Sequence, residues 1–218
     1  MTDEWRYDPP PEPLVVLHED RDTVVIDKPP GLLSVPGRDP AHADSALSRI
    51  RRRWPGAHDV HRLDLDTSGV LVFATRRKAE RALKEAFRER RVQKRYVARV
   101  AGRVEEEAGC ISLPLRREVG RPRSVVDRAN GRGARTRFRV ISREEDSTLV
   151  ELVPETGRSH QLRVHLLAIG HPILGDRFYA PVGPRSRADR LLLHATALVF
   201  PHPFHGGRVS VVAGVPFS

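Results

Sequence analysis

Short segments of apolar residues recur along the chain, many of them alternating with polar residues, which is the pattern of half-buried β-strands. Polar turns and proline-glycine stretches, such as KPPG at residues 28–31, separate these segments and stop the strands. The segment 70–74 is continuously apolar and β-branched, so it predicts a buried strand. The predicted strands cover residues 14–18, 23–27, 70–74, 96–100, 137–141, 148–153, 195–200 and 209–212.

Two longer segments repeat their apolar residues at the helical period of 3.6, and they predict helices at residues 77–90 and 158–169. A shorter helix is expected at residues 46–54, where Pro55 and Gly56 end it. Strands therefore outnumber helices. This pattern indicates an α+β fold with a mixed, largely antiparallel sheet and flanking helices and loops.

Two segments lack a periodic pattern. Residues 1–13 are rich in proline and predict a flexible N-terminal tail. Residues 116–135 are rich in glycine, arginine and proline and predict a long basic loop, a type of segment that is often functional. Since the sequence shows neither an internal repeat nor a domain linker, we expect one domain over residues 14–218.

Composition narrows the class of protein. The chain has 218 residues, of which 39% are hydrophobic and 30% charged, as in a soluble globular protein. It contains no apolar run of the roughly 18 residues that span a bilayer, and its start does not resemble a signal peptide. Cys110 is the only cysteine, which excludes an intrachain disulfide. We therefore expect a cytoplasmic protein that does not enter a membrane.

Positive charge dominates the sequence. The formal net charge is +10 and the sequence pI is about 10.8, which favours a polyanionic partner such as nucleic acid. The alternative explanation of this charge is the base composition of the genome. Nearly all the positive side chains are arginine, and GC-rich genomes favour arginine codons. The triplet Arg51, Arg52 and Arg53 is a candidate for phosphate contacts, and its alternative is the solvated end of a helix.

The segment HRLDLDTSG at residues 61–69 gathers two carboxylates, an arginine and a turn just before the buried strand. A strand holds such a loop in place, so Asp64 is a candidate for a positioned carboxylate. In a purely structural interpretation Asp64 pairs with Arg62, and Asp66 accepts hydrogen bonds from the amides that follow it.

Two further segments contain candidate site residues. In TGRSHQLRVH at residues 156–165, Arg158 comes near a predicted helix start, a place suited to anions. Its forked guanidinium is able to hold a carboxylate bidentately. In the alternative interpretation Arg158 is an ordinary surface residue without a role in a site. Tyr96 lies on an apolar strand and offers a ring for stacking, and an ordinary core tyrosine is the alternative.

Together these segments resemble one family. HRLDLDTSG is similar to the signature motif of the RluA-type pseudouridine synthases. Further similar segments are DKPPGLLSVPGR at 27–38, KRYVARVAG at 94–102, TGRSHQLRVHLLAIGHPILGDRFYA at 156–180 and LLLHATALVFPHP at 191–203. They follow the family's order and cover about residues 14–203. The short length and the SVPGR loop are most similar to the family's dual-specificity member.

The resemblance implies a pseudouridine synthase catalytic fold over residues 14–218, without the S4-like domain that some members carry. It implies that Asp64 is the catalytic carboxylate, assisted by Arg158, which keeps Asp64 ionised, and by Tyr96, which lies against the uracil. The residues expected to bind RNA are His61, Arg62, Leu162, Arg51, Arg52 and Arg53. The isomerisation of uridine needs neither a cofactor nor a metal. The expected partners of this monomer are the anticodon loop of tRNA and 23S rRNA.

Functions from other classes fit the sequence less well. Histidines at 160, 165 and 171, and at 194, 202 and 205, have spacings from which zinc ligands are possible, but neither set matches a standard zinc pattern. A hydrolase using Ser159 and His160 is disfavoured because adjacent helical side chains point apart. An RNA-binding module without catalysis explains the charge but not the set of Asp64, Tyr96 and Arg158.

Overall fold

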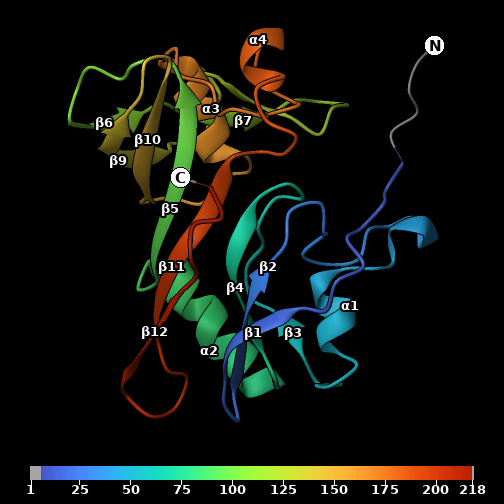
Figure 1. Cartoon of the computed structure of the whole chain (residues 1–218). Coiled ribbons are helices and arrows are strands. Elements are labelled where there is room, and N and C mark those ends of the chain that lie inside the picture. The colour runs from blue at the N-terminus through green and yellow to red at the C-terminus, as the bar shows by residue number, and fades with distance from the viewer. Residues whose placement is uncertain (1–5, 218) are drawn as a thin grey trace. The chain divides into compact units, whose positions relative to one another are not determined.

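Residues 6–217 are described by the computed structural model, and they separate into two units that interleave along the sequence (Figure 1). Within the described part, unit 1 contains residues 6–92 and 199–213, and unit 2 contains residues 93–198 and 214–217. The prediction of one domain from residue 14 onward did not anticipate this subdivision.

The sheet of unit 1 is built on three neighbouring strands, β1 (Val15–Glu19), β2 (Thr23–Lys28) and β4 (Ser68–Ala74). Both pairings are antiparallel, and the register of β2 on β4 runs from Thr23 opposite Ala74 to Lys28 opposite Gly69. The short strand β3 (His58–Asp59) pairs antiparallel with the end of β4. Every residue of β4 is buried, and its apolar run at 70–74 is the segment that predicted a buried strand.

The turn between β1 and β2 is closed by the carboxylate of Asp20. The amides of Asp22 and Thr23 each donate to its Oδ1 at 2.7 Å, and the His18 ring lies 3.0 Å from its Oδ2. Burial by itself raises the pKa of Asp20, but these hydrogen bonds, that of His18 first, lower it to about 2. The ionised carboxylate thus fixes the turn.

Two α-helices and one short 3-10 helix complete the first part of unit 1. Helix α1 (Ala46–Ile50) begins with a capping box in which Ser45 accepts from the Ser48 amide and Ser48 accepts from the Ser45 amide. It follows the 3-10 helix η1 (Pro40–His42). Helix α2 (Arg77–Arg88) buries one face and packs beside β3 and β4 (Figure 1). The last strand of the unit is β12 (Arg208–Val212), which pairs with β11 (Leu193–Pro201).

The sheet of unit 2 has the order β5 (Gln93–Ala101), β10 (Ser147–Pro154), β9 (Arg135–Arg143) and β6 (Ala108–Ser112). All three pairings are antiparallel. Strand β11 begins in this unit and ends in unit 1. The prediction of an α+β fold with a largely antiparallel sheet is confirmed.

The core of unit 2 forms between its sheet and helix α3 (Gln161–Ala168). Ala98 and Val100 of β5 and Leu152 of β10 are fully buried, and Leu162 and Leu166 of α3 join the same cluster. The short helix α4 (Val182–Arg185) lies farther along the chain. Of the apolar face predicted for the helix at 158–169, Leu162 and Leu166 pack into this cluster, whereas Ile169 follows α3 and is 37% exposed.

The segment predicted as a basic loop at residues 116–135 is not structureless. It contains most of an antiparallel hairpin formed by β7 (Leu115–Arg117) and β8 (Ser124–Val126). Leu115 is buried with Ala134 and Val164 in a small cluster of its own. The loop prediction was wrong because three-residue strands are too short to show a period, and because the anchoring contacts come from α3, about 40 residues away in sequence.

Residues 1–13 were expected to form a flexible tail. Residues 1–5 lie outside the described part, whereas Tyr7, Pro10 and Glu12 make hydrogen bonds with unit 1. Among the described residues, no helix has the length and apolar character that crossing a bilayer requires.

Candidate active site

Asp64 lies in the loop between β3 and β4 and is partly exposed, whereas Leu63 before it is 7% exposed. The Thr67 amide donates to the main-chain oxygen of Asp64 at 3.2 Å, which closes a tight turn. The residues from Asp66 to the end of β4 are buried. The carboxylate of Asp64 therefore projects from a short turn attached directly to the most buried strand of unit 1.

Lys28 is the most unusual residue of this region, since it is a fully buried lysine at the end of β2. Its Nζ donates to the main-chain oxygens of Pro29 and Leu32, both at 2.8 Å, and to that of Leu65 at 2.9 Å. Hydrogen bonds from an ionised donor are stronger than neutral ones. Lys28 thus ties the residue after Asp64 to the loop that follows β2.

The residue before Asp64 is held by the same loop. The Ser34 hydroxyl donates to the Leu63 oxygen at 2.7 Å, and its oxygen accepts from the Leu63 amide at 3.0 Å. The Gly31 amide donates to the Leu65 oxygen at 3.0 Å, and its φ of +76° is a conformation that favours glycine. Both neighbours of Asp64 are therefore fastened to residues 28–34.

The sequence interpretation did not identify these positioning residues. It quoted the segment DKPPGLLSVPGR as part of the resemblance but assigned no role to Lys28 or Ser34. The available signal was a lysine and a serine flanking a proline-glycine turn. That signal does not reveal that their partners lie 37 and 29 residues further along the chain.

His61 and Arg62 were both expected to contact RNA. The His61 ring stacks on Phe87 of α2 with centroids 4.6 Å apart, and its Nε2 accepts from the Val72 amide at 3.2 Å. These contacts give His61 a structural role in unit 1. Arg62 is exposed, and contact of either residue with RNA stays a prediction.

The triplet Arg51, Arg52 and Arg53 follows α1, which ends at Ile50 rather than at residue 54 as predicted. All three side chains are exposed. Arg51 Nε donates to the Ala57 oxygen at 3.0 Å, and Arg53 pairs with Glu19 at 2.8 Å. The exposure is compatible with phosphate contacts, which stay a prediction.

Tyr96 of unit 2 lies on β5 opposite Leu152 of β10 and is partly buried against the core cluster. Leu162 of α3 belongs to the same cluster and is 7% exposed. The structure therefore brings these two predicted site residues together within unit 2.

Arg158 precedes α3 and does not form its first turn, because the helix begins at Gln161 and His160 has a left-handed φ of 56°. The predicted helix start at residue 158 was therefore wrong. The Arg158 amide donates to Gln161 Oε1 at 3.0 Å, and its Nε donates to the Gly133 oxygen at 3.2 Å. Gln161, which is 4% exposed, braces this loop and was missed by the sequence interpretation.

Asp64, His61 and Arg62 belong to unit 1, whereas Tyr96 and Arg158 belong to unit 2. The structure gives each group its own local support. The assignment of a joint catalytic role to them stays a prediction.

The histidines that prompted a zinc alternative include His202 and His205. Within residues 6–217, the one group whose ligand atoms lie close enough for a metal is Asp22, His202 and His205, all within 4.8 Å. His202 Nδ1 accepts from the amides of Phe204 and His205, at 3.2 and 3.1 Å. A neutral ring then carries its proton on Nε2, which leaves no lone pair for a metal. The arrangement does not favour a metal site.

Comparison with known proteins bears on the activity. The chain matches the family model for RNA pseudouridylate synthase over residues 22–168. It is 51% identical over 214 residues to the dual-specificity RNA pseudouridine synthase RluA of Escherichia coli O6:H1, covering 97% of this chain and 98% of that protein. The RluA of Salmonella typhimurium strain LT2 is 51% identical over 207 residues, covering 94% of each chain.

The fold has a solved counterpart. The structure of human RNA pseudouridylate synthase domain containing 1 superposes with a TM-score of 0.81 at 31% identity, covering 97% of this chain and 87% of that one. The family match spans most of both units, and the relatives are matched over nearly their whole length. The chain that holds Asp64 between two fastened neighbours therefore belongs to the RNA pseudouridine synthase family.

Proposed function

We propose that this protein converts specific uridines to pseudouridine in the anticodon loop of tRNA and in a hairpin of 23S rRNA, with Asp64 as its essential carboxylate. The observation that carries the proposal is the fastening of Leu63 and Leu65, which fixes the main chain on both sides of Asp64. A carboxylate held in this way keeps its orientation when substrate binds, so little entropy is lost at the reacting centre.

The reaction breaks the N1–C1′ bond of uridine, turns the base, forms a C5–C1′ bond and releases the C5 proton, while N1 takes up a proton. Asp64 either attacks C1′ or removes the 2′ proton, and both routes need the ionised carboxylate. In this proposal Arg158 and Tyr96 assist Asp64 in the reaction, and Tyr96 lies against the uracil and helps to remove the C5 proton.

Recognition is proposed to depend on unstacked RNA. A base inside a stack must be flipped out at a cost of a few kcal/mol, and that cost is smallest in loops. Arg62 and the exposed triplet at 51–53 are the proposed phosphate contacts, supported by the net charge of +10. Leu162 offers an apolar contact to the base only through the small part of its side chain that is exposed. We also propose that the protein acts as a cytoplasmic monomer without cofactor or metal.

The test is a set of single-turnover measurements of tritium release from C5-labelled uridine in a tRNA anticodon stem-loop. Asp64→Asn conserves the size of the side chain. It should slow the reaction by about 10²- to 10⁴-fold or more, and the affinity for RNA should stay nearly unchanged. Asp39→Asn is the matched control, because Asp39 is an exposed aspartate in unit 1. A folded Asp64→Asn protein that reacts at a rate comparable to wild type would refute the assignment.

Substrate choice needs a separate experiment. Pseudouridine is mapped in tRNA and 23S rRNA from cells with and without the protein. The proposal expects losses at one anticodon-loop position and one 23S rRNA hairpin. Modification of assembled ribosomal subunits alone would contradict recognition of a local loop.

A further inference from the structure

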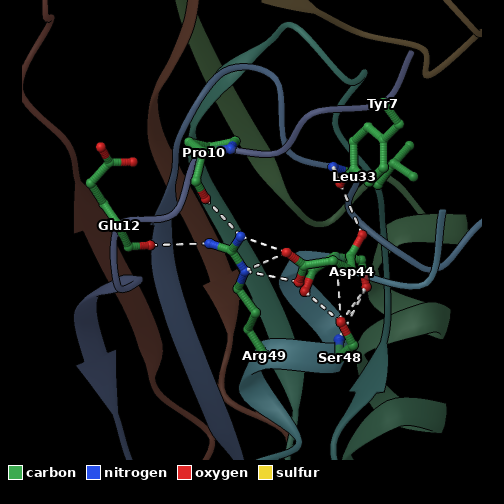
Figure 2. Close-up of polar contacts among 8 residues, drawn as sticks. Tyr7, Pro10, Glu12, Leu33, Asp44, Ser48 and Arg49 are labelled. Atoms are coloured by element: carbon green, nitrogen blue, oxygen red, sulfur yellow. Dashed lines mark hydrogen bonds and ion pairs between the residues drawn. The ribbon is translucent and has the colours of Figure 1, made fainter. Parts of the chain in front are cut away.

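The segment 7–12, which we term the N-terminal strap, lies across unit 1 and is held by the guanidinium of Arg49 (Figure 2). Arg49 Nη2 donates to the main-chain oxygen of Pro10 at 2.7 Å, and Nη1 donates to that of Glu12 at 3.0 Å. Main-chain oxygens are the acceptors, so a guanidinium with several fixed donors is the side chain suited to hold both.

Asp44 orients the same guanidinium from its other side (Figure 2). Arg49 Nε donates to Asp44 Oδ1 at 2.9 Å, and Nη2 donates to Oδ2 at 2.6 Å. The hydrogen bonds from Arg49 lower the pKa of Asp44, so the pair remains ionised at neutral pH. The Arg49 side chain is 13% exposed. Its direction is therefore fixed by a bidentate, largely buried contact.

Tyr7 makes the second attachment of the strap. Its hydroxyl donates to the main-chain oxygen of Asp44 at 2.9 Å and accepts from the Leu33 amide at 3.1 Å. The ring lies edge-on to His42 with centroids 5.5 Å apart. One hydroxyl thus joins the strap, the start of the α1 region and the loop that follows β2.

That loop is the one that fastens the neighbours of Asp64. Ser34, next to Leu33, holds Leu63 through both of its hydroxyl contacts, and Gly31 holds the Leu65 oxygen. Pro10 lies close to Gly31, where even a single added methyl group would come within 3.8 Å of Pro10 Cδ. A continuous set of contacts therefore runs from the strap through residues 31–34 to both sides of Asp64.

We infer that the N-terminal strap positions the carboxylate of Asp64, and that Tyr7 and Arg49 are positioning residues of the isomerisation. The strap touches the loop at residues 31 and 33, and the loop touches the main chain at residues 63 and 65. Release of the strap loosens this loop and lets Asp64 leave its reactive orientation without removing any group that contacts RNA. This inference rests on the proposed role of Asp64.

The variants Tyr7→Phe and Arg49→Lys test it in the full chain. Phenylalanine keeps the ring on His42 but loses both hydrogen bonds, and lysine keeps a charge near Asp44 but lacks the second branch that reaches the strap. Each should lower the single-turnover rate at saturating anticodon stem-loop by roughly tenfold, because small displacements of a reacting group are costly. The dissociation constant for RNA should stay within about twofold. Arg88→Lys, on the exposed face of α2, is the matched control.

A double-mutant cycle separates positioning from general destabilisation. Ser34→Ala is combined with Tyr7→Phe, and the rates are measured well below the melting temperature of each variant. If both act through the same loop, the combined rate loss is smaller than the product of the single losses. Fully multiplicative losses, or variants that melt earlier but react at the wild-type rate, would overturn the inference. If the strap variants are fully active while the Asp64→Asn protein is inactive, only the positioning role of the strap is refuted. If the Asp64→Asn protein is itself active, the proposed function is refuted.

Discussion

The buried ammonium of Lys28 is the group most directly linked to the residue after Asp64, and Lys28→Met removes it with little change in side-chain length. Three main-chain oxygens, of Pro29, Leu32 and Leu65, then lose the hydrogen bond from Lys28, and that of Leu65 keeps the Gly31 amide. Methionine adapts its shape to irregular core space, so the substitution tests the charge and the hydrogen bonds rather than the volume.

The magnitude for Lys28→Met follows from its three hydrogen bonds. A hydrogen bond from a charged group contributes roughly 1.5–3 kcal/mol, which gives a gross loss of about 4.5–9 kcal/mol for the three together. Removing the charge also removes its desolvation cost of several kcal/mol. We expect a net loss of about 2–4 kcal/mol in the free energy of unfolding. For a chain of this length that lowers the melting temperature by roughly 4–16 °C.

The assay combines thermal unfolding with single-turnover tritium release below the melting temperature. Since the Leu65 oxygen beside Asp64 then keeps only the Gly31 amide as a donor, the rate should fall by about 10- to 100-fold in protein that is still folded. The matched control is Lys84→Met, in which the lysine is half exposed and pairs at 2.7 Å with Glu80, a buried carboxylate that keeps Arg77 as a partner at 2.8 Å. It should cost less than about 1 kcal/mol. A Lys28→Met protein that melts and reacts like the control would refute the reasoning.

Three further predictions concern pH and salt. Because the folded-state pKa of Asp20 is lowered to about 2, its contribution to stability is present above the unfolded pKa of about 4 and is lost as pH falls toward 2; Asp20→Asn should flatten thermal stability over that window. Burial lowers the pKa of His165, so only the unfolded state gains the proton below about pH 6.5 and stability falls with pH there; His165→Gln should weaken that dependence in melting curves from pH 7 to 5. Replacing Arg51, Arg52 and Arg53 by alanine should reduce the slope of log affinity against log salt by roughly 0.7 for each single-strand phosphate that the triplet neutralises, and an unchanged slope would assign the triplet to solvent.

The sequence by itself determined most of the longer strands and the family motif, but not the short strands β3, β6, β7 and β8. The alternation in residues 148–153 and the apolar run at 70–74 each predicted a strand that the structure contains, with ends shifted by at most two residues. Such patterns are local, because successive side chains of a strand point to opposite faces and the apolar ones mark the buried face. HRLDLDTSG and the further matching segments likewise indicated the family together, through residue types and their order along the chain, for which no coordinates are needed.

Only the tertiary structure decided which residues support Asp64. A lysine before two prolines has the sequence of an exposed turn, yet Lys28 is fully buried because Leu65 supplies an acceptor 37 residues away. The strap contact of Tyr7 with Leu33 spans 26 residues in the same way. The interpretation of residues 1–13 as a tail could not include these contacts.

The structure also decided roles that residue type leaves open. His61, predicted to contact RNA, accepts a hydrogen bond from Val72 and stacks on Phe87, and the hairpin at 115–126 is anchored by packing against α3. A hydrogen-bond partner or a packing neighbour is selected by the folded path of the chain rather than by adjacent sequence. Local patterns therefore predict elements and motifs. Burial and long-range hydrogen bonds, by contrast, form only when folding brings distant segments of the chain together.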